Sequence, residues 1–147
     1  MFQHLLVPTD GSPLSQEAVA RAASFAREAG ARVTLFYASP DSPAAYDGVG
    51  AISDAHITQT VRDQLASASQ EILDAAEACM REAGVPCERL ALKGNKPWEL
   101  IIKAASQRSC DLIFMASHGR RGVSALLLGS ETQKVLTHSK IPVLVFR

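Results

Sequence analysis

The chain has 147 residues, 47% of them hydrophobic, and its 15 basic and 15 acidic side chains give a formal net charge of zero. That length suits one domain spanning residues 1–147, large enough to bury roughly two thirds of its unfolded surface, and the balanced charge creates no field that would attract nucleic acid or an anionic membrane. No apolar run reaches the roughly 20 residues that cross a bilayer, and the first residues lack a signal-peptide pattern, so we expect a cytoplasmic protein.

The beginning of the chain predicts a strand, a capped helix and a second strand. Residues 2–8 contain a short apolar run that is typical of a strand covered on both faces. Ser12 is placed as an N-cap and Pro13 as the first helical residue, and Gly30 marks the helix end. Residues 33–38 form the second predicted strand.

The middle of the chain predicts a long loop, a long helix and a third strand. Residues 39–55 are rich in Pro, Gly, Ser and Asp and too long for an ordinary turn, so they form either a flap near the site or an insertion without a role. Apolar residues then recur at steps of three and four and predict an amphipathic helix from His56 to Ala83, with the stripe Ile57, Val61, Leu65, Ala68, Ile72, Ala75, Cys79 and Ala83. Residues 86–92 follow as the third strand.

The last part of the chain repeats the same alternation. The turn at residues 94–97 opens a helix in which Trp98 is either a packing anchor or the wall of a ligand pocket. Residues 112–116 predict a fourth strand, residues 130–138 a helix and residues 141–146 a fifth strand. Strands that alternate with helices predict a parallel sheet with right-handed crossovers, in a doubly wound, flavodoxin-like or Rossmann-like sandwich.

The segment after the fourth strand carries the clearest signal of a site. In such a sheet, ligands bind beyond the carboxyl ends of the strands, and a helix start offers unpaired N–H groups to an anion. Gly129 and Ser130 begin a helix in this place, which favours phosphate binding. The alternative is plain helix capping, because residues 130–133 read Ser-Glu-Thr-Gln and fit a capping box.

The same segment resembles the nucleotide loop of the universal stress protein family. ATP-binding members of that family carry Gly, two residues, Gly, nine residues, Gly and then Ser or Thr, and Gly119, Gly129 and Ser130 match this pattern in type and spacing. Ala116 stands where the family has its first Gly, and its methyl group would hinder close backbone approach, or cost about 1 kcal/mol if the position needs a positive φ. The opening residues 7–10 and the closing residues 142–145 also match, so the resemblance spans nearly the whole chain.

The resemblance implies a single-domain, three-layer sandwich with a five-stranded parallel sheet in the order 3-2-1-4-5, of the adenine nucleotide alpha hydrolase-like type. The first and fourth strands would then be neighbours, so the turns that follow them would face one crevice. The implied nucleotide-binding residues are Pro8, Thr9, Asp10, Ser12, Ala38, Met115, Ala116, Ser117, His118, Gly119, Arg120, Gly129, Ser130, Glu131 and Thr132.

The main-chain N–H groups of Gly119, Gly129, Ser130 and Glu131 would bind the phosphates, and other positions have roles of their own. The backbone of Ala38 would meet the adenine ring, and Asp10 would accept a ribose hydroxyl or hold Mg²⁺, although Asp before Gly is also ordinary turn chemistry. Arg120 and its neighbour Arg121 would grip a phosphate, or else remain solvated loop charges. The ligand implied is ATP, or ADP or AMP, with Mg²⁺ as a possible companion.

The motifs that are missing limit the chemistry. There is no GxxxxGK[ST] and no GxGxxG, which argues against a fast ATPase and a dehydrogenase. Ser117 and His118 are adjacent, but there is no GxSxG elbow, so we expect no hydrolase triad and assign no catalytic residue. The three cysteines are odd in number and form no CxxC pair, which favours reduced, buried thiols over a disulfide or zinc site.

The resemblance therefore implies a stress-response protein that binds an adenine nucleotide as a switch. Two alternatives remain open: a dimeric interaction module of the same family that has lost nucleotide binding, which Ala116 favours, and a slow ATPase in which Asp10 holds magnesium. The strand predicted at residues 141–146 would lie at a sheet edge with few charges, so we also expect a homodimer through this edge.

Overall fold

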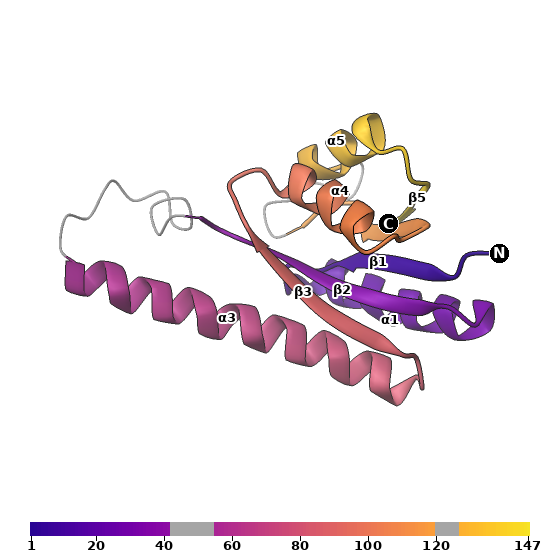
Figure 1. The fold of residues 1–147 in the computed structure, drawn as a ribbon, viewed down its shortest axis with the longest axis horizontal. Helices are drawn as coiled ribbons and strands as arrows, with labels where there is room; N and C mark the ends of the chain where they lie inside the picture. The colour runs from indigo at the N-terminus through magenta and orange to yellow at the C-terminus, as the bar shows by residue number, and fades with distance from the viewer. Residues whose placement is uncertain (42–54, 120–126) are drawn as a thin grey trace.

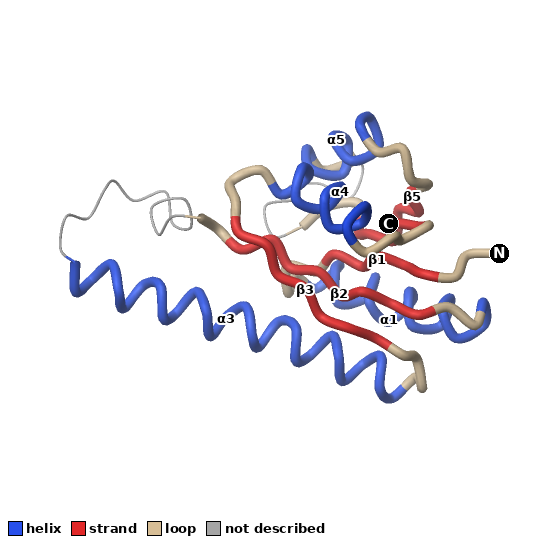
Figure 2. The backbone as a smooth tube through the Cα atoms, viewed as in Figure 1, coloured by secondary structure: helices blue, strands red, loops and turns tan. Residues whose placement is uncertain are grey.

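The chain folds as a three-layer α/β sandwich around one parallel sheet (Figures 1 and 2). The structure is a computed structural model that describes residues 1–41, 55–119 and 127–147. Its strands are β1 (His4–Pro8), β2 (Arg32–Ser39), β3 (Cys87–Lys93), β4 (Leu112–Ala116) and β5 (Val143–Phe146). They pair in parallel in the order β3-β2-β1-β4-β5, which confirms the expected fold and strand order.

Two helices cover each face of the sheet. Helices α1 (Pro13–Ala29) and α3 (Ala55–Glu82) lie against one face, and α4 (Pro97–Gln107) and α5 (Ser130–His138) lie against the other (Figure 1). Each face buries its own apolar cluster: Leu5, Leu35 and Met80 belong to the first, and Leu6, Phe36 and Val135 to the second. Among the helices that the structure describes, none combines the length and apolarity needed to cross a bilayer.

The ends of α1 follow the local chemistry of the sequence. The Ser12 hydroxyl accepts a hydrogen bond from the Ser15 N–H, and Pro13 occupies the first turn, as expected. Gly30 ends the helix in the left-handed region with φ of 66°, a conformation that favours glycine. The capped start fixes where the chain leaves β1, and therefore where the β1–α1 turn lies.

The buried face of α3 differs from the predicted stripe. Leu65 is buried as expected, but further along the helix Leu73, Ala76 and Met80 are the buried residues, while Ala75 is exposed. The sequence has apolar residues both on the predicted stripe and at the next position along the helix. The packing of α3 on β2 and β3 places the second set deepest in the core. Ile72, Cys79 and Ala83 of the predicted stripe are partly buried and pack against the same cluster, so beyond Ala68 the prediction is wrong only at Ala75.

The position of β1 creates the crevice in which the site lies. β1 pairs with β2 on one side, with Leu5 opposite Val33, and with β4 on the other, with Leu5 opposite Leu112. The chain passes to α1 on one face after β1 and to α5 on the other face after β4, so the connections diverge between these two strands (Figure 1). This is the switch point at which open α/β sheets bind ligands.

Candidate functional site

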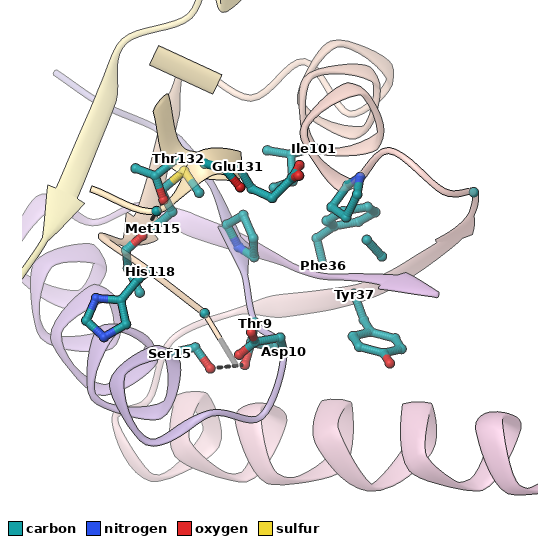
Figure 3. A pocket seen from close by; sticks show the side chains of 18 of the residues that line it. Thr9, Asp10, Ser15, Phe36, Tyr37, Ile101, Met115, His118, Glu131 and Thr132 are labelled. Carbon is teal, nitrogen blue, oxygen red and sulfur yellow. Dashed lines mark hydrogen bonds between the residues drawn. The ribbon is translucent and has the colours of Figure 1, made fainter. Parts of the chain in front are cut away.

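A cavity of about 430 Å³ opens at the carboxyl ends of the strands, at this switch point (Figure 3). Its volume falls within the roughly 300–1,000 Å³ of typical small-molecule sites. The cavity is lined by Pro8, Thr9, Asp10, Ser15, Phe36, Tyr37, Ala38, Pro40, Gly94, Asn95, Pro97, Ile101, Met115, Ala116, His118, Gly119, Gly129, Ser130, Glu131 and Thr132. The turn after β1 and the segments on both sides of the β4–α5 loop therefore share one cavity.

The β1–α1 turn presents Thr9 and Asp10 to the cavity. The Asp10 carboxylate accepts a hydrogen bond of 2.9 Å from the Ser12 N–H, and the Thr9 and Ser15 hydroxyls lie 3.2 Å apart. Gly11 has a φ of 78°, which lets the chain turn sharply between these residues. Ser12 does not line the cavity, because its hydroxyl is used to cap α1.

Ala116 adopts an ordinary strand conformation at the end of β4. It pairs with Phe146, it is 7% exposed, and its carbonyl accepts a hydrogen bond of 3.1 Å from the Thr132 hydroxyl. Ser109 is the only non-glycine residue with a positive φ among those described, so Ala116 carries no left-handed strain. The cost of about 1 kcal/mol that a positive φ would impose does not apply, and the cavity exists with the Ala116 methyl in its wall.

The backbone of Ser117 joins the end of β4 to the start of α5. The Ser117 N–H donates to the Phe146 carbonyl at 2.7 Å, and the Ser117 carbonyl accepts from the Gly129 N–H at 2.7 Å. The buried Ser117 hydroxyl lies 3.2 Å from Nδ1 of His118, and only His118 of this pair lines the cavity. Ser117 is thus a structural residue in this geometry.

Two glycines allow the backbone segments of the site to approach closely. A Cβ atom on Gly119 would lie 2.2 Å from Oδ2 of Asp10, closer than non-bonded Cβ contacts come, so the carboxylate would have to shift. A Cβ on Gly129 would lie 3.1 Å from Cα of His118 and 3.2 Å from the Ser117 carbonyl oxygen. The β4–α5 segment therefore lies directly against the β1–α1 turn.

Helix α5 begins without a side-chain cap. Gly129 is the N-cap residue and Ser130 the first helical residue, and no side chain of the described residues caps this end. The predicted capping box is therefore wrong: the N-cap is Gly129, one residue before Ser130, and its N–H donates to the Ser117 carbonyl. The Gln133 side chain donates instead to the Leu128 carbonyl at 3.0 Å. The first-turn N–H groups of α5, which lack intrahelical acceptors, are left at the cavity wall.

Glu131 bridges α5 to the start of α4, a contact that the sequence analysis missed. Its Oε2 accepts a hydrogen bond of 2.9 Å from the Trp98 N–H, and its Oε1 lies 3.9 Å from the Lys134 ammonium. Figure 3 shows the Glu131 side chain extending from α5 toward the side of the cavity where Ile101 lies. The Trp98 ring stacks on His138 with centroids 4.6 Å apart and does not line the cavity, so of the two predicted roles the packing anchor is correct.

The cavity also has apolar lining residues. Phe36 and Tyr37 from β2, Ile101 from α4 and Met115 from β4 line it, and all four are at least 93% buried. Several lining residues were not predicted, namely Ser15, Phe36, Tyr37, Pro40, Gly94, Asn95, Pro97 and Ile101. Most of them could have been predicted from their position at or just after the carboxyl ends of β2 and β3, because parallel sheets bind ligands at this edge.

Some predicted elements lie outside the described residues. Arg120, Arg121 and most of the predicted flap at residues 39–55 are among them. Within the part of the chain that the structure describes, no three or more His, Cys, Asp or Glu side chains are grouped to hold a metal ion. Asp10 alone would thus need a ligand's own oxygens to complete a magnesium site.

A doubly wound parallel sheet with a cavity at its switch point and an uncapped helix start at the cavity wall defines a Rossmann-like α/β ligand-binding fold. The sequence model of the Universal stress protein family matches residues 1–147. The chain belongs to the universal stress protein family.

Known relatives and solved structures agree with this assignment. The chain is 33% identical to the Thermus aquaticus universal stress protein in the QAH/OAS sulfhydrylase 3′ region, over the full length of both chains. It is 31% identical to universal stress protein MJ0531 of Methanocaldococcus jannaschii, covering all of this chain and 83% of that protein. The structure of MJ0577 from the same organism superposes with a TM-score of 0.81 at 24% identity and covers 99% of this chain and 95% of that one.

Two similar structures contain a bound nucleotide. A universal stress protein in complex with cAMP has a TM-score of 0.74 at 25% identity, covering 99% of this chain and 97% of that one. The Archaeoglobus fulgidus universal stress protein in complex with dAMP has a TM-score of 0.66 at 19% identity, covering 100% and 98%. At 19% identity the second likeness concerns the fold alone.

Proposed function

We propose that this protein binds ATP or a related adenine nucleotide in the cavity at the switch point and acts as a cytoplasmic stress-response switch. The observation that carries the proposal is that one cavity combines buried apolar side chains with an uncapped helix start. An adenine nucleotide has matching parts, namely a flat base and a charged phosphate. The cAMP complex of a similar universal stress protein supports the same class of ligand.

In this proposal the phosphate lies at the start of α5. The first-turn N–H groups of Ser130, Glu131 and Thr132 donate to its oxygens, and the positive end of the helix dipole favours its charge. Gly129 keeps this approach open, because a side chain there would meet the backbone of His118. Ser130 is exposed at the cavity wall, and its hydroxyl adds a donor.

The base packs against buried apolar side chains of the cavity in this proposal. Phe36, Ile101 and Met115 offer buried apolar surface, and Ala38 offers its backbone at the end of β2. Asp10 lines the cavity from the β1–α1 turn, where its carboxylate accepts a hydrogen bond from a ribose hydroxyl or binds Mg²⁺ together with phosphate oxygens. Its bond to the Ser12 N–H holds it in that turn.

In this proposal, binding of the nucleotide changes the conformation of the β1–α1 turn and the start of α5, which both line the cavity. A bound ligand contacts both the β1–α1 turn and the start of α5, so it favours conformations in which these segments stay together. The readout surface that we propose is a homodimer interface along β5, an edge strand whose residues Val143–Phe146 are all partly buried apolar residues. Pro142, which has no N–H, limits pairing at its start.

Calorimetric titration with ATP and Mg²⁺ tests the proposal, with Ser130→Glu as the diagnostic variant. A carboxylate at the first residue of α5 repels a phosphate there but suits the helix dipole, so affinity falls at least roughly tenfold while stability is maintained or rises by about 0.3–1 kcal/mol. Ser24→Glu adds the same charge at an exposed position of α1 that does not line the cavity, and it leaves binding unchanged.

The same titration separates the two alternative functions. Heats equal to those of buffer at millimolar nucleotide would overturn nucleotide binding and favour the dimeric interaction module. If nucleotide binds, phosphate release that falls sharply in Asp10→Ala would favour the slow ATPase, and release that is unchanged in that variant would remove it.

A further inference from the structure

The cavity wall carries acidic side chains near the proposed phosphate position. Of the lining residues within the described chain, Asp10 and Glu131 are acidic, His118 carries an imidazole and Tyr37 a phenol, and neither Lys nor Arg is among them. Two carboxylates thus face a cavity that, in the proposed function, receives an anion.

Glu131 is the carboxylate closest in sequence to the helix start, and it is fixed in place. It is the second residue of α5, so its own N–H belongs to the first turn of the helix. The Trp98 N–H holds its Oε2 at 2.9 Å, and Trp98 is itself held by stacking on His138. The side chain is 39% exposed, and Lys134 compensates its charge only weakly at 3.9 Å.

We propose that Glu131 is a selectivity residue that favours adenine nucleotides with one phosphate over those with three. The inference rests on the proposed nucleotide binding. Each added phosphate group brings at least one further negative charge, and repulsion by a fixed carboxylate grows with the charge of the ligand. The monophosphate retains the helix N–H groups as donors and meets less of this repulsion.

Magnesium reduces the discrimination in this account. A divalent cation bound to the phosphates cancels much of the triphosphate charge and gives Asp10 a ligand of opposite sign. The preference for the monophosphate is therefore greatest when divalent cations are removed with EDTA, and it weakens as salt screens the partly exposed carboxylate.

The experiment is calorimetric titration of AMP and ATP into the wild-type protein and Glu131→Gln, in EDTA at low salt. Glutamine keeps an acceptor oxygen for the Trp98 N–H and removes the charge. ATP affinity is expected to rise roughly tenfold, equivalent to about 1.4 kcal/mol, and AMP affinity by no more than about threefold. The difference between the gain in ATP affinity and the gain in AMP affinity is expected to become smaller when salt or Mg²⁺ is added.

Two control variants separate charge from structure. Glu99→Gln removes a carboxylate from the first turn of α4, where Glu99 pairs with Lys96 and does not line the cavity, and it leaves the AMP to ATP ratio unchanged. Glu131→Ala removes the acceptor for Trp98 as well as the charge, so it weakens AMP binding relative to Glu131→Gln while it still raises the ratio of ATP to AMP affinity above that of the wild type.

The outcomes distinguish this inference from the function on which it rests. Equal changes in AMP and ATP affinity in Glu131→Gln would overturn the selectivity role and leave nucleotide binding intact. Failure of both nucleotides to bind either the wild type or Glu131→Gln would overturn the proposed function and the inference together. Binding of ATP that appears only in Glu131→Gln would support both.

Discussion

The contact between Gly119 and Asp10 offers a direct thermodynamic test of how the two halves of the site fit together. In Gly119→Ala the new methyl group would lie 2.2 Å from Oδ2 of Asp10, so the carboxylate must rotate away. The Ser12 N–H donates to the other oxygen of this carboxylate, Oδ1, and we expect the rotation to weaken or break that 2.9 Å bond. A hydrogen bond to a charged group contributes about 1.5–3 kcal/mol, and partial exposure of the turn places the expected loss of unfolding free energy near 1–2 kcal/mol.

The change in unfolding free energy caused by Gly119→Ala is expected to reverse its sign when Asp10 is replaced. Gly119 is not among the described glycines with a positive φ, so alanine suits its backbone. In an Asp10→Ala background the clash disappears, and Gly119→Ala then stabilises the protein by about 0.4–1 kcal/mol because it restricts the unfolded chain. The same substitution therefore destabilises the wild type and stabilises the variant.

Urea denaturation of the wild type, the two single variants and the double variant measures this coupling. The expected coupling energy is at least about 1.5 kcal/mol, well above the 0.3–0.5 kcal/mol within which independent sites usually add. Additive changes in unfolding free energy would refute the reasoning, because they would mean that the β4–α5 segment and the β1–α1 turn do not meet in solution.

Two further predictions concern the amino end of β1 and the sheet edge. Burial lowers the pKa of His4 from its ordinary 6.5, with the charge of Arg32 adding to the effect and those of Glu88 and Asp111 opposing it. As the pH drops below about 6.5, the unfolded chain takes up a proton on this histidine before the folded protein does, so the unfolding free energy falls. His4→Phe is expected to reduce this pH dependence of the unfolding free energy, measured by denaturation at several pH values. The same pH dependence in the wild type and the variant would contradict this prediction. In the proposed dimer, Val145→Lys on β5 is expected to give a monomer by light scattering. The control Ala91→Lys on β3, the other edge strand, is expected to leave the dimer intact. A monomeric wild-type protein at micromolar concentration would reject the dimer.

Local chemistry was sufficient to predict much of the fold. Ser12, Pro13 and Gly30 mark the ends of α1 by capping rules that depend only on neighbouring residues, and the structure confirms them. The strand order came from the family resemblance together with the alternation of strands and helices, and the observed sheet has that order. Because the order determines which turns are adjacent, it also brought most of the predicted residues into one cavity.

The features that could not be predicted depend on contacts between distant parts of the chain. The exposed position of Ala75 follows from how α3 packs on the sheet, since apolar residues on either side allow two faces. The N-cap of α5 is Gly129 instead of Ser130, and the Gly129 N–H bonds to Ser117 across the β4–α5 loop. The Glu131 to Trp98 bond joins residues 33 positions apart, and no local pattern signals it.

The central claim is that the main-chain N–H groups at the start of α5 hold the phosphate of a nucleotide that also contacts the β1–α1 turn. The most direct test is an amide NMR titration of the isotopically labelled protein with AMP. The account predicts the largest shift changes at Gly119, Gly129, Ser130, Glu131 and Thr132, together with changes at Asp10 and Ala38. A spectrum that stays unchanged at millimolar AMP, or changes confined to residues away from this cavity, would contradict it.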